Sequence, residues 1–160
     1  RSRNHRSICQ LLAILPPPTR TPSLAHWRSL SFVMESVPLS LAGLIEHRLV
    51  MTIDNVRVIV KQLLYGLAAM FGARIVHRDL KAENILVRDA ATLEVCIADY
   101  GLAREVNDDM TRRYMPPAVM SPEVLIDDKT EGGIYGLCDV WSLGCLTYQL
   151  LTAQHLFRHR

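Results

Sequence analysis

A polar segment between two short apolar runs carries the residue types that chemistry on a phosphate would need. The stretch IVHRDLKAENILV occupies residues 75–87, and its centre holds Asp79, Lys81 and Asn84. A carboxylate can orient an attacking hydroxyl group, a lysine can neutralise phosphoryl oxygens, and an amide oxygen can bind a hard cation such as magnesium. Phosphoryl transfer depends mainly on such positioning and electrostatic stabilisation. The segment is therefore either an ordinary solvated turn or a catalytic loop.

A second carboxylate could complete a magnesium site. Asp99 follows an expected strand at residues 93–98 and stands two residues before Gly101. Each residue also has an ordinary structural reading: His77 as a satisfied core histidine, Lys81 as a solvent-exposed side chain, and Asp99 as the cap of a turn. Only the joint occurrence of these residues favours a site.

The elements that must position this segment are visible in the apolar spacing. Between residues 52 and 72, apolar side chains recur three and four positions apart, which predicts an amphipathic helix with Thr52 as N-cap and Gly72 as its end. The residues of this stripe are expected in the core: Val56, Ile59, Val60, Leu63, Leu64, Leu67, Ala68 and Phe71. A second amphipathic helix is expected from about Asp139 to Leu151.

Strands are expected on both sides of the first helix. Residues 8–15 predict a buried strand, which the proline-rich residues 16–23 end, and residues 29–35 predict the next strand. Residues 37–49 have apolar side chains at helical spacing, and residues 93–98 alternate as a strand does. Residues 99–122 show little periodicity and predict a long loop.

Composition excludes several classes of protein. The chain has 160 residues, of which 49% are hydrophobic, and this is enough for a single buried core. The 18 basic and 16 acidic residues are interspersed, so we expect no nucleic-acid partner. The chain has no apolar run of about 18 residues, so we expect no membrane span. The four cysteines form no CxxC pair and no metal-ligand spacing, which favours a reducing compartment, the cytoplasm or the nucleus.

Four motifs in order resemble those of eukaryotic protein kinases. Residues 77–84 (HRDLKAEN) resemble the catalytic loop, and residues 99–101 (DYG) resemble the metal-binding DFG motif. Residues 121–123 (SPE) are similar to the APE motif, and residues 139–144 (DVWSLG) to the helix beneath it. Further stretches resemble the mitogen-activated protein kinases: NHRSICQLLAILPP (4–17), DYGLAR (99–104), DDMT (108–111) and DVWSLGC (139–145). The lysine at position 81 matches the serine/threonine class.

The resemblance covers nearly the whole chain and implies an α+β, protein-kinase-like fold that is truncated. Residues 1–36 would form a remnant of the small lobe, with the end of the C helix, two strands and the hinge. Residues 37–160 would form part of a mainly α-helical large lobe with the catalytic loop, the activation segment and the F helix. The chain contains no glycine-rich GxGxxG loop and no VAIK-like strand lysine. We therefore expect a fragment that is inactive as an isolated chain.

The resemblance also implies roles for individual residues. In the loop, Asp79 matches the catalytic base, Lys81 the γ-phosphate contact, and Asn84 and Asp99 the magnesium ligands. His77 and Asp139 match residues that brace the loop, and Arg78 matches the arginine that meets the phosphate of the activation segment. Met34, Glu35, Ser36 and Val37 match the gatekeeper and hinge, and Leu86 matches the residue beneath the adenine. Thr111 and Tyr114 match the phosphorylation candidates, which are separated here by two arginines.

The sequence therefore predicts a serine/threonine protein kinase of the mitogen-activated type, which transfers the γ-phosphate of ATP to protein hydroxyls with Mg²⁺. Its expected partners are a protein substrate and an upstream activating kinase. Two alternatives remain: a catalytically dead kinase-like binding module, and the debris of a kinase reading frame. The intact Asp79, Lys81, Asn84 and Asp99 favour an enzyme, whereas the altered residues 112–120 favour a dead module.

Overall fold

The computed structural model describes residues 5–15, 31–46, 51–105, 121–122 and 137–157. The elements in chain order are β1 (Leu11–Leu15), β2 (Ser31–Met34), β3 (Leu39–Ser40), α1 (Leu41–Glu46), α2 (Ile53–Gly72), β4 (Ile75–Val76), the 3₁₀ helix η2 (Ala82–Asn84), β5 (Ile85–Asp89), β6 (Glu94–Ile97), β7 (Arg104–Glu105) and α5 (Cys138–Thr152). None of the helices in these ranges is both long enough and apolar enough to cross a bilayer.

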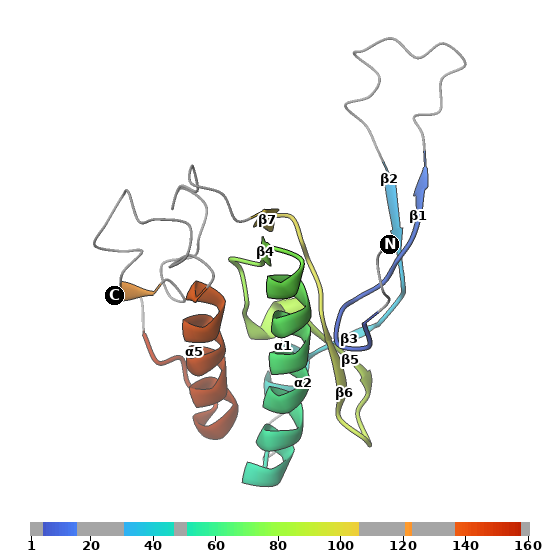
Figure 1. The fold of residues 1–160 in the computed structure, drawn as a ribbon. Coiled ribbons are helices and arrows are strands. Elements are labelled where there is room, and N and C mark those ends of the chain that lie inside the picture. The colour runs from blue at the N-terminus through green and yellow to red at the C-terminus, as the bar shows by residue number, and fades with distance from the viewer. Residues whose placement is uncertain (1–4, 16–30, 47–50, 106–120, 123–136, 158–160) are drawn as a thin grey trace, which may run out of the picture.

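The architecture is α+β, as the sequence predicts. An antiparallel sheet with the order β3-β5-β6 packs against α2, and α5 packs against α2 away from this sheet (Figure 1). The short strands β4 and β7 form a separate pair, and β1 and β2 form a hairpin that projects from the rest of the molecule (Figure 1). The division after residue 36 into a small-lobe remnant and a large lobe stays a prediction.

The predicted helix at residues 52–72 is confirmed with its caps. The hydroxyl oxygen of Thr52 accepts a hydrogen bond from the Asn55 N–H at 3.2 Å, and α2 ends at Gly72. The buried face of α2 includes Val56, Ile59, Leu63, Leu67 and Met70. This face joins the core of the molecule because β6 and α5 pack against it.

Part of the expected core stripe on α2 is exposed. Leu64 is 48% exposed and Phe71 is 58% exposed, and Ala68 is exposed as well. These residues line an open apolar pocket together with Ile75, Leu137 and Val140. The prediction was wrong here because the apolar stripe is wider than the area that β6 and the described part of α5 cover.

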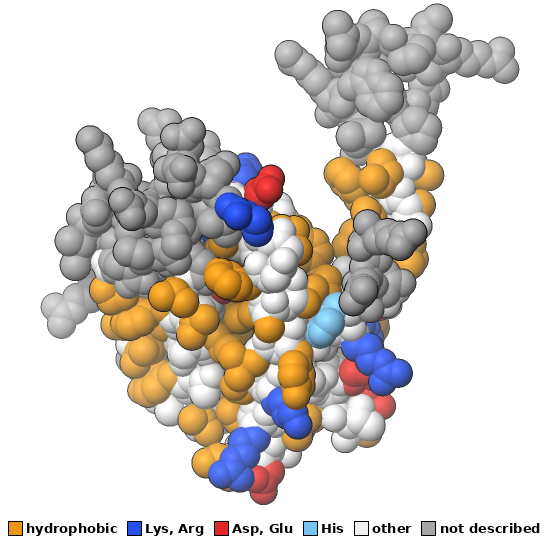
Figure 2. Space-filling view, in the orientation of Figure 1, with side chains coloured by type: hydrophobic (Ala, Val, Ile, Leu, Met, Phe, Trp, Pro, Cys, Tyr) orange, Lys and Arg blue, Asp and Glu red, His pale blue; other side chains and the backbone are white. Residues whose placement is uncertain are grey.

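The strand expected at residues 8–15 forms as β1, but its predicted burial is wrong. Every residue of β1 is exposed, and Phe32 of β2 is 59% exposed. The hairpin pairs Leu11 with Met34 and Leu15 with Ser31. Met34 packs against the cluster of Cys9, Cys96 and Ala98, whereas the side chains of β1 are exposed. Figure 2 shows these apolar side chains on the surface of the hairpin. A two-stranded sheet without a covering layer cannot bury its side chains.

Two other expectations need correction. The helical spacing at residues 37–49 forms the short strand β3 and then the six-residue helix α1, whereas residues 47–50 lie outside the described chain. The strand β6 does not alternate between buried and exposed positions, because Val95, Cys96 and Ile97 are all buried. Val95 and Ile97 join the main core under α2, and Cys96 joins a second cluster with Cys9.

The close contact of α2 with the N-terminal segment depends on a glycine. A Cβ atom on Gly66 would lie 2.9 Å from Ile97 Cδ1 and 2.9 Å from the Ser7 carbonyl oxygen. We expect Gly66→Ala to lower the free energy of unfolding by about 1–3 kcal/mol, because the added methyl group overpacks this contact. Urea unfolding followed by circular dichroism measures this change.

The matched control is Gly144→Ala in α5, where a Cβ atom would meet nothing within 4 Å. This change should raise stability by roughly 0.5–1 kcal/mol through helix propensity. Equal effects of the two substitutions would contradict the packing at Gly66.

Candidate active site

A buried carboxylate holds the start of the polar loop. Asp139 lies in the first turn of α5, and its Oδ2 and Oδ1 accept hydrogen bonds from the backbone N–H groups of His77 and Arg78, each at 2.8 Å. Burial raises the pKa of Asp139, and the two N–H donors oppose this shift. The carboxylate thus fixes two consecutive peptide groups of a loop that is about 60 residues away in the sequence.

The imidazole ring of His77 connects the loop to the strand that follows. His77 is fully buried, and its Nδ1 accepts a hydrogen bond from the Asp79 N–H at 3.3 Å. The proton therefore lies on Nε2, which donates to the Ala98 carbonyl at 2.9 Å. The Tyr100 ring packs edge-on, with 5.8 Å between the ring centroids. These contacts are the bracing that the sequence predicts for His77 and Asp139.

Arg78 lies inside the site in an unusual backbone conformation. Its φ is 68°, its exposed fraction is 3%, and its Nε donates to the Leu102 carbonyl at 2.8 Å. The guanidinium group thus reaches the segment that follows the DYG motif. Thr111 and Tyr114 lie outside the described residues, so a contact between Arg78 and a phosphate there stays a prediction.

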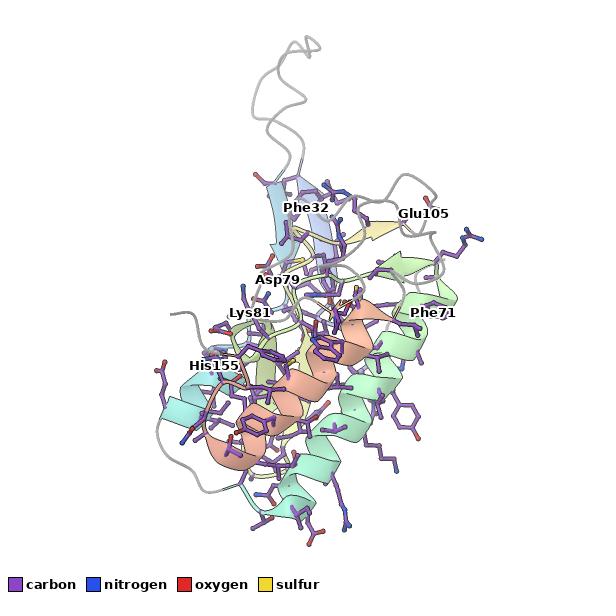
Figure 3. The ribbon with its side chains drawn as sticks, turned by 90° about the vertical axis from the view of Figure 1, so that its left-hand side faces the viewer. Phe32, Phe71, Asp79, Lys81, Glu105 and His155 are labelled. Atoms are coloured by element: carbon purple, nitrogen blue, oxygen red, sulfur yellow. The ribbon has the colours of Figure 1, made fainter. Side chains whose placement is uncertain are left out.

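The structure brings three predicted catalytic residues together. Lys81 Nζ lies 2.8 Å from Asp79 Oδ2 and 3.0 Å from Oδ1, and both residues lie on the same loop (Figure 3). Asn84 Nδ2 donates to Asp79 Oδ2 at 2.9 Å and to the Asp79 carbonyl at 2.8 Å. Because the amide nitrogen of Asn84 faces Asp79, the Oδ1 atom of Asn84 is left without a hydrogen bond among the described residues.

Asp99 adjoins this group through its main chain. The Ala98 N–H donates to the Asn84 carbonyl at 2.9 Å, and Asp99 follows with a φ of 61°. The Asp99 side chain is exposed, and Oδ1 accepts from the Gly101 N–H at 3.2 Å. Asp99 therefore caps its own turn, and its second carboxylate oxygen forms no hydrogen bond or ion pair with the described residues. This oxygen and Asn84 Oδ1 are the donor types that magnesium prefers.

The predicted hinge presents backbone groups rather than side chains. The Glu35 N–H donates to the Gln10 carbonyl at 3.0 Å. Within the described chain, the Glu35 carbonyl, the Val37 N–H and the Val37 carbonyl form no hydrogen bond. Met34 and Leu86 pack beside the hinge against the buried pair Cys9 and Cys96. The adenine-binding role of these residues stays a prediction.

The side chain of Glu35 has a structural role that the sequence did not reveal. Arg88 NH2 lies 2.6 Å from Glu35 Oε1, and Arg88 Nε donates to Oε2 at 3.1 Å. These bonds lower the pKa of Glu35, and partial burial opposes the shift. Arg88 was also missed, because it is 53 residues from Glu35 and no local spacing links the two.

Two of the four cysteines, which show no metal-ligand spacing in the sequence, lie close together in the structure. Cys9 and Cys96 are buried, and their sulfur atoms lie within 4.8 Å of each other and of a Glu35 oxygen. Burial raises the pKa of Cys96 to about 12. The three residues come from separate segments, so sequence spacing carried no signal for them.

Removing the Asp139 carboxylate tests its role as an anchor. Asp139→Ala leaves two buried N–H groups without acceptors, so the free energy of unfolding should fall by about 2–4 kcal/mol. Asp54→Ala is the control, because Asp54 occupies the first turn of α2 and is exposed. It should change stability by less than about 0.5 kcal/mol. Similar losses in the two variants in chemical unfolding would contradict the anchor.

The ion pair between Glu35 and Arg88 should make stability depend on pH. Because the pKa of Glu35 is lower in the folded state than its ordinary 4.5, the pair stabilises the fold fully above pH 4.5 and loses this effect as pH falls. The difference in unfolding free energy between wild type and Glu35→Gln should therefore shrink below about pH 4.5.

Chemical unfolding between pH 3 and pH 7 measures this difference. Glu83→Gln is the control, because Glu83 is exposed and forms no ion pair among the described residues. A wild-type curve that stays parallel to that of Glu35→Gln would contradict the prediction.

Comparisons with known proteins relate the chain to one family. The family described as "Protein kinase domain" matches residues 1–160. Mitogen-activated protein kinase 4a of Physcomitrium patens is 31% identical over 162 residues, which cover 100% of this chain and 41% of that protein. Mitogen-activated protein kinase homolog MMK2 of Medicago sativa is 32% identical over 164 residues, with coverages of 100% and 41%.

A solved structure gives the same fold. The crystal structure of the yeast RNA Pol II CTD kinase CTDK-1 complex matches with a TM-score of 0.79 and 26% identity. The match covers 99% of this chain and 49% of that chain. The chain thus spans less than half the length of the proteins that it matches.

Proposed function

Because the chain belongs to the protein kinase family, we propose that the protein transfers the γ-phosphate of ATP to serine or threonine hydroxyls in mitogen-activated-type signalling. The observation that carries the proposal is the joined arrangement of Asp79, Lys81 and Asn84 on a loop braced from α5. An ordinary solvated turn would not need a buried carboxylate to fix two of its peptide groups.

The proposed chemistry assigns a proton acceptor and a cation to the same loop. The Asp79 carboxylate would orient the substrate hydroxyl group and accept its proton, as the new oxygen–phosphorus bond forms and the bond from the γ-phosphorus to the departing ADP oxygen breaks. Lys81 now neutralises this carboxylate, and its half-buried Nζ is close enough to turn toward phosphoryl oxygens. The same ammonium group would then offset the negative charge that develops on the transferred group.

Magnesium would be held by oxygen atoms that have no other partner in the described chain. Asn84 Oδ1 and the Asp99 carboxylate match the donor set that this ion prefers. Magnesium bound with ATP supplies positive charge to the phosphate oxygens. The turn that Asp99 caps with Gly101 keeps one of its carboxylate oxygens available.

The hinge would bind the adenine ring through its backbone. Adenine presents a donor and an acceptor along one edge, and the Glu35 carbonyl with the Val37 N–H offers the complementary pair. Met34 and Leu86, which lie on the adjoining apolar cluster, would contact the ring faces. The side chain of Glu35 takes no part in this proposal because Arg88 already binds it.

Regulation and partners belong to the same proposal. A phosphate on Thr111 or Tyr114 would attract Arg78 through a charge-assisted bond, and an upstream kinase would place it. Protein substrates, and a location in the cytoplasm or the nucleus, complete the proposal. The similarity to mitogen-activated protein kinases supports the signalling role.

Nucleotide binding by the 160-residue chain is the direct test of the site. The chain contains no glycine-rich loop, so the test reads binding rather than turnover. MgATP at about 100 times its dissociation constant should raise the melting temperature of wild type by roughly 5–10 °C. Asp99→Ala should lose most of this shift, because it removes a magnesium ligand.

The control is Asp54→Ala, which alters an exposed carboxylate of α2 and should retain the wild-type shift. The absence of a shift in wild type would contradict the proposed nucleotide site and favour the binding-module alternative. An equal shift in Asp99→Ala would contradict the assignment of Asp99.

A further inference from the structure

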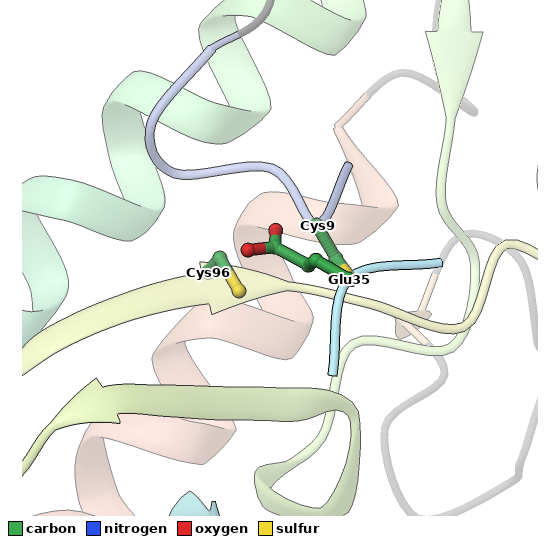
Figure 4. A group of neighbouring side chains, drawn as sticks. All are labelled: Cys9, Glu35 and Cys96. Atoms are coloured by element: carbon green, nitrogen blue, oxygen red, sulfur yellow. The ribbon is translucent and has the colours of Figure 1, made fainter. Parts of the chain in front are cut away.

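Three side chains with metal-binding donor atoms meet behind the hinge. Cys9 precedes β1, Glu35 follows β2, and Cys96 lies in β6 (Figure 4). The two sulfur atoms and a Glu35 oxygen all lie within 4.8 Å of one another. The thiols are nearly inaccessible, with exposed fractions of 5% for Cys9 and 0% for Cys96. The cluster is therefore compact and shielded from bulk water.

The backbone register indicates how the two thiols can be joined. Ile8 bridges Ile97 in a parallel sense, with the Cys9 N–H bonded to the Ile97 carbonyl and the Ile97 N–H bonded to the Ser7 carbonyl. Cys9 thus lies across from Ala98, and Cys96 is its diagonal neighbour on the same face. Diagonal neighbours on adjacent strands are farther apart than residues directly opposite each other, whereas a disulfide needs Cα atoms roughly 4.4–6.8 Å apart.

A metal ion bound by both thiolates spans the distance between Cys9 and Cys96 better than a disulfide bond does. A thiolate–zinc bond is about 2.3 Å long, so two thiolates on one tetrahedral ion are separated by nearly twice the length of a disulfide bond. The sulfur atoms lie within 4.8 Å of each other, a range that includes the separation of two thiolates on one such ion. The geometry therefore favours a bridging cation over direct oxidation.

We propose that Cys9, Cys96 and Glu35 bind one thiophilic divalent cation, with zinc as the best fit. Two thiolates and one carboxylate supply three ligands of a tetrahedral site, and water supplies the fourth. Because water takes the fourth position, this site is open, unlike closed structural sites with four protein ligands. This proposal does not depend on the proposed kinase function.

The charges balance when the ion binds. The two thiols release two protons as the two metal–sulfur bonds form, and the Glu35 carboxylate contributes its existing negative charge. Three negative ligands, a divalent cation and the Arg88 guanidinium then sum to zero. Arg88 and the Gln10 N–H, which lies 2.7 Å from Glu35 Oε1, also orient the carboxylate as outer-shell partners.

The bound ion would join three segments that are already linked by backbone hydrogen bonds, from the Cys9 N–H to the Ile97 carbonyl and from the Glu35 N–H to the Gln10 carbonyl. It would connect the strand that leads into the exposed hairpin, the hinge, and β6, which packs under α2. A purely apolar role explains the thiols, which pack with Ala98, Met34 and Leu86. Glu35 adds a carboxylate that Arg88 and the Gln10 N–H hold in place, with an oxygen within 4.8 Å of both sulfur atoms.

Cobalt(II) titration of the reduced full chain tests the site, because tetrahedral cobalt has visible bands and thiolate ligation adds a charge-transfer band. We expect one equivalent to bind with both signals and zinc to displace it. Cys9→Ser and Cys96→Ser should each weaken binding by at least about tenfold. Cys145→Ser is the control and should bind as wild type does. Folded serine variants with unchanged affinity, or no stoichiometric binding by wild type, would overturn the proposal.

A second measurement needs no variant and so avoids failures of folding. Zinc should slow the alkylation of Cys9 and Cys96 in wild type, read by peptide mass spectrometry, while Cys138 and Cys145 react at an unchanged rate. Slowing of all four thiols alike, or of none, would overturn the proposal. Formation of a Cys9–Cys96 disulfide in air while zinc is bound would overturn it as well.

Discussion

The site depends on one buried carboxylate that accepts the hydrogen bonds of two buried backbone N–H groups, which water would otherwise accept. Asp139 lies in the first turn of α5, where a negative charge also interacts favourably with the helix dipole, and it binds the N–H groups of His77 and Arg78. A buried charge is costly unless hydrogen bonds compensate it, so this contact constrains the loop strongly. From there, the His77 ring extends the constraint to Ala98, directly before Asp99.

This anchoring allows the loop to hold conformations that residues other than glycine rarely adopt. Arg78 has a φ of 68° and Asp99 a φ of 61°. Such positions cost about 1–3 kcal/mol each and persist only where the surroundings determine them. Asp139 and the Leu102 carbonyl hold Arg78, and the bond from Ala98 to Asn84 holds the strand before Asp99. Both strained residues lie where the proposed chemistry needs a fixed side chain.

The sequence predicted the features that depend on local residue patterns. It missed the features that depend on whether another element covers an apolar face. The helix from Thr52 followed from periodicity and capping, and the polar loop at residues 77–84 from the order of motifs. Periodicity shows that a face is apolar but not that another element covers it, so the exposure of β1 and Phe71 was missed. The contacts of Glu35 join segments far apart in the sequence, and no spacing rule identifies them.

Native-state hydrogen exchange of the His77 and Arg78 amides tests the anchor most directly. If the Asp139 carboxylate holds both N–H groups in a buried site, these amides should exchange only through global unfolding, as slowly as the core amides of α2. Exchange of either amide as fast as that of the exposed turn at Ala91 would show that the loop opens independently of α5. That result would contradict the account of how this chain positions Asp79, Lys81 and Asn84.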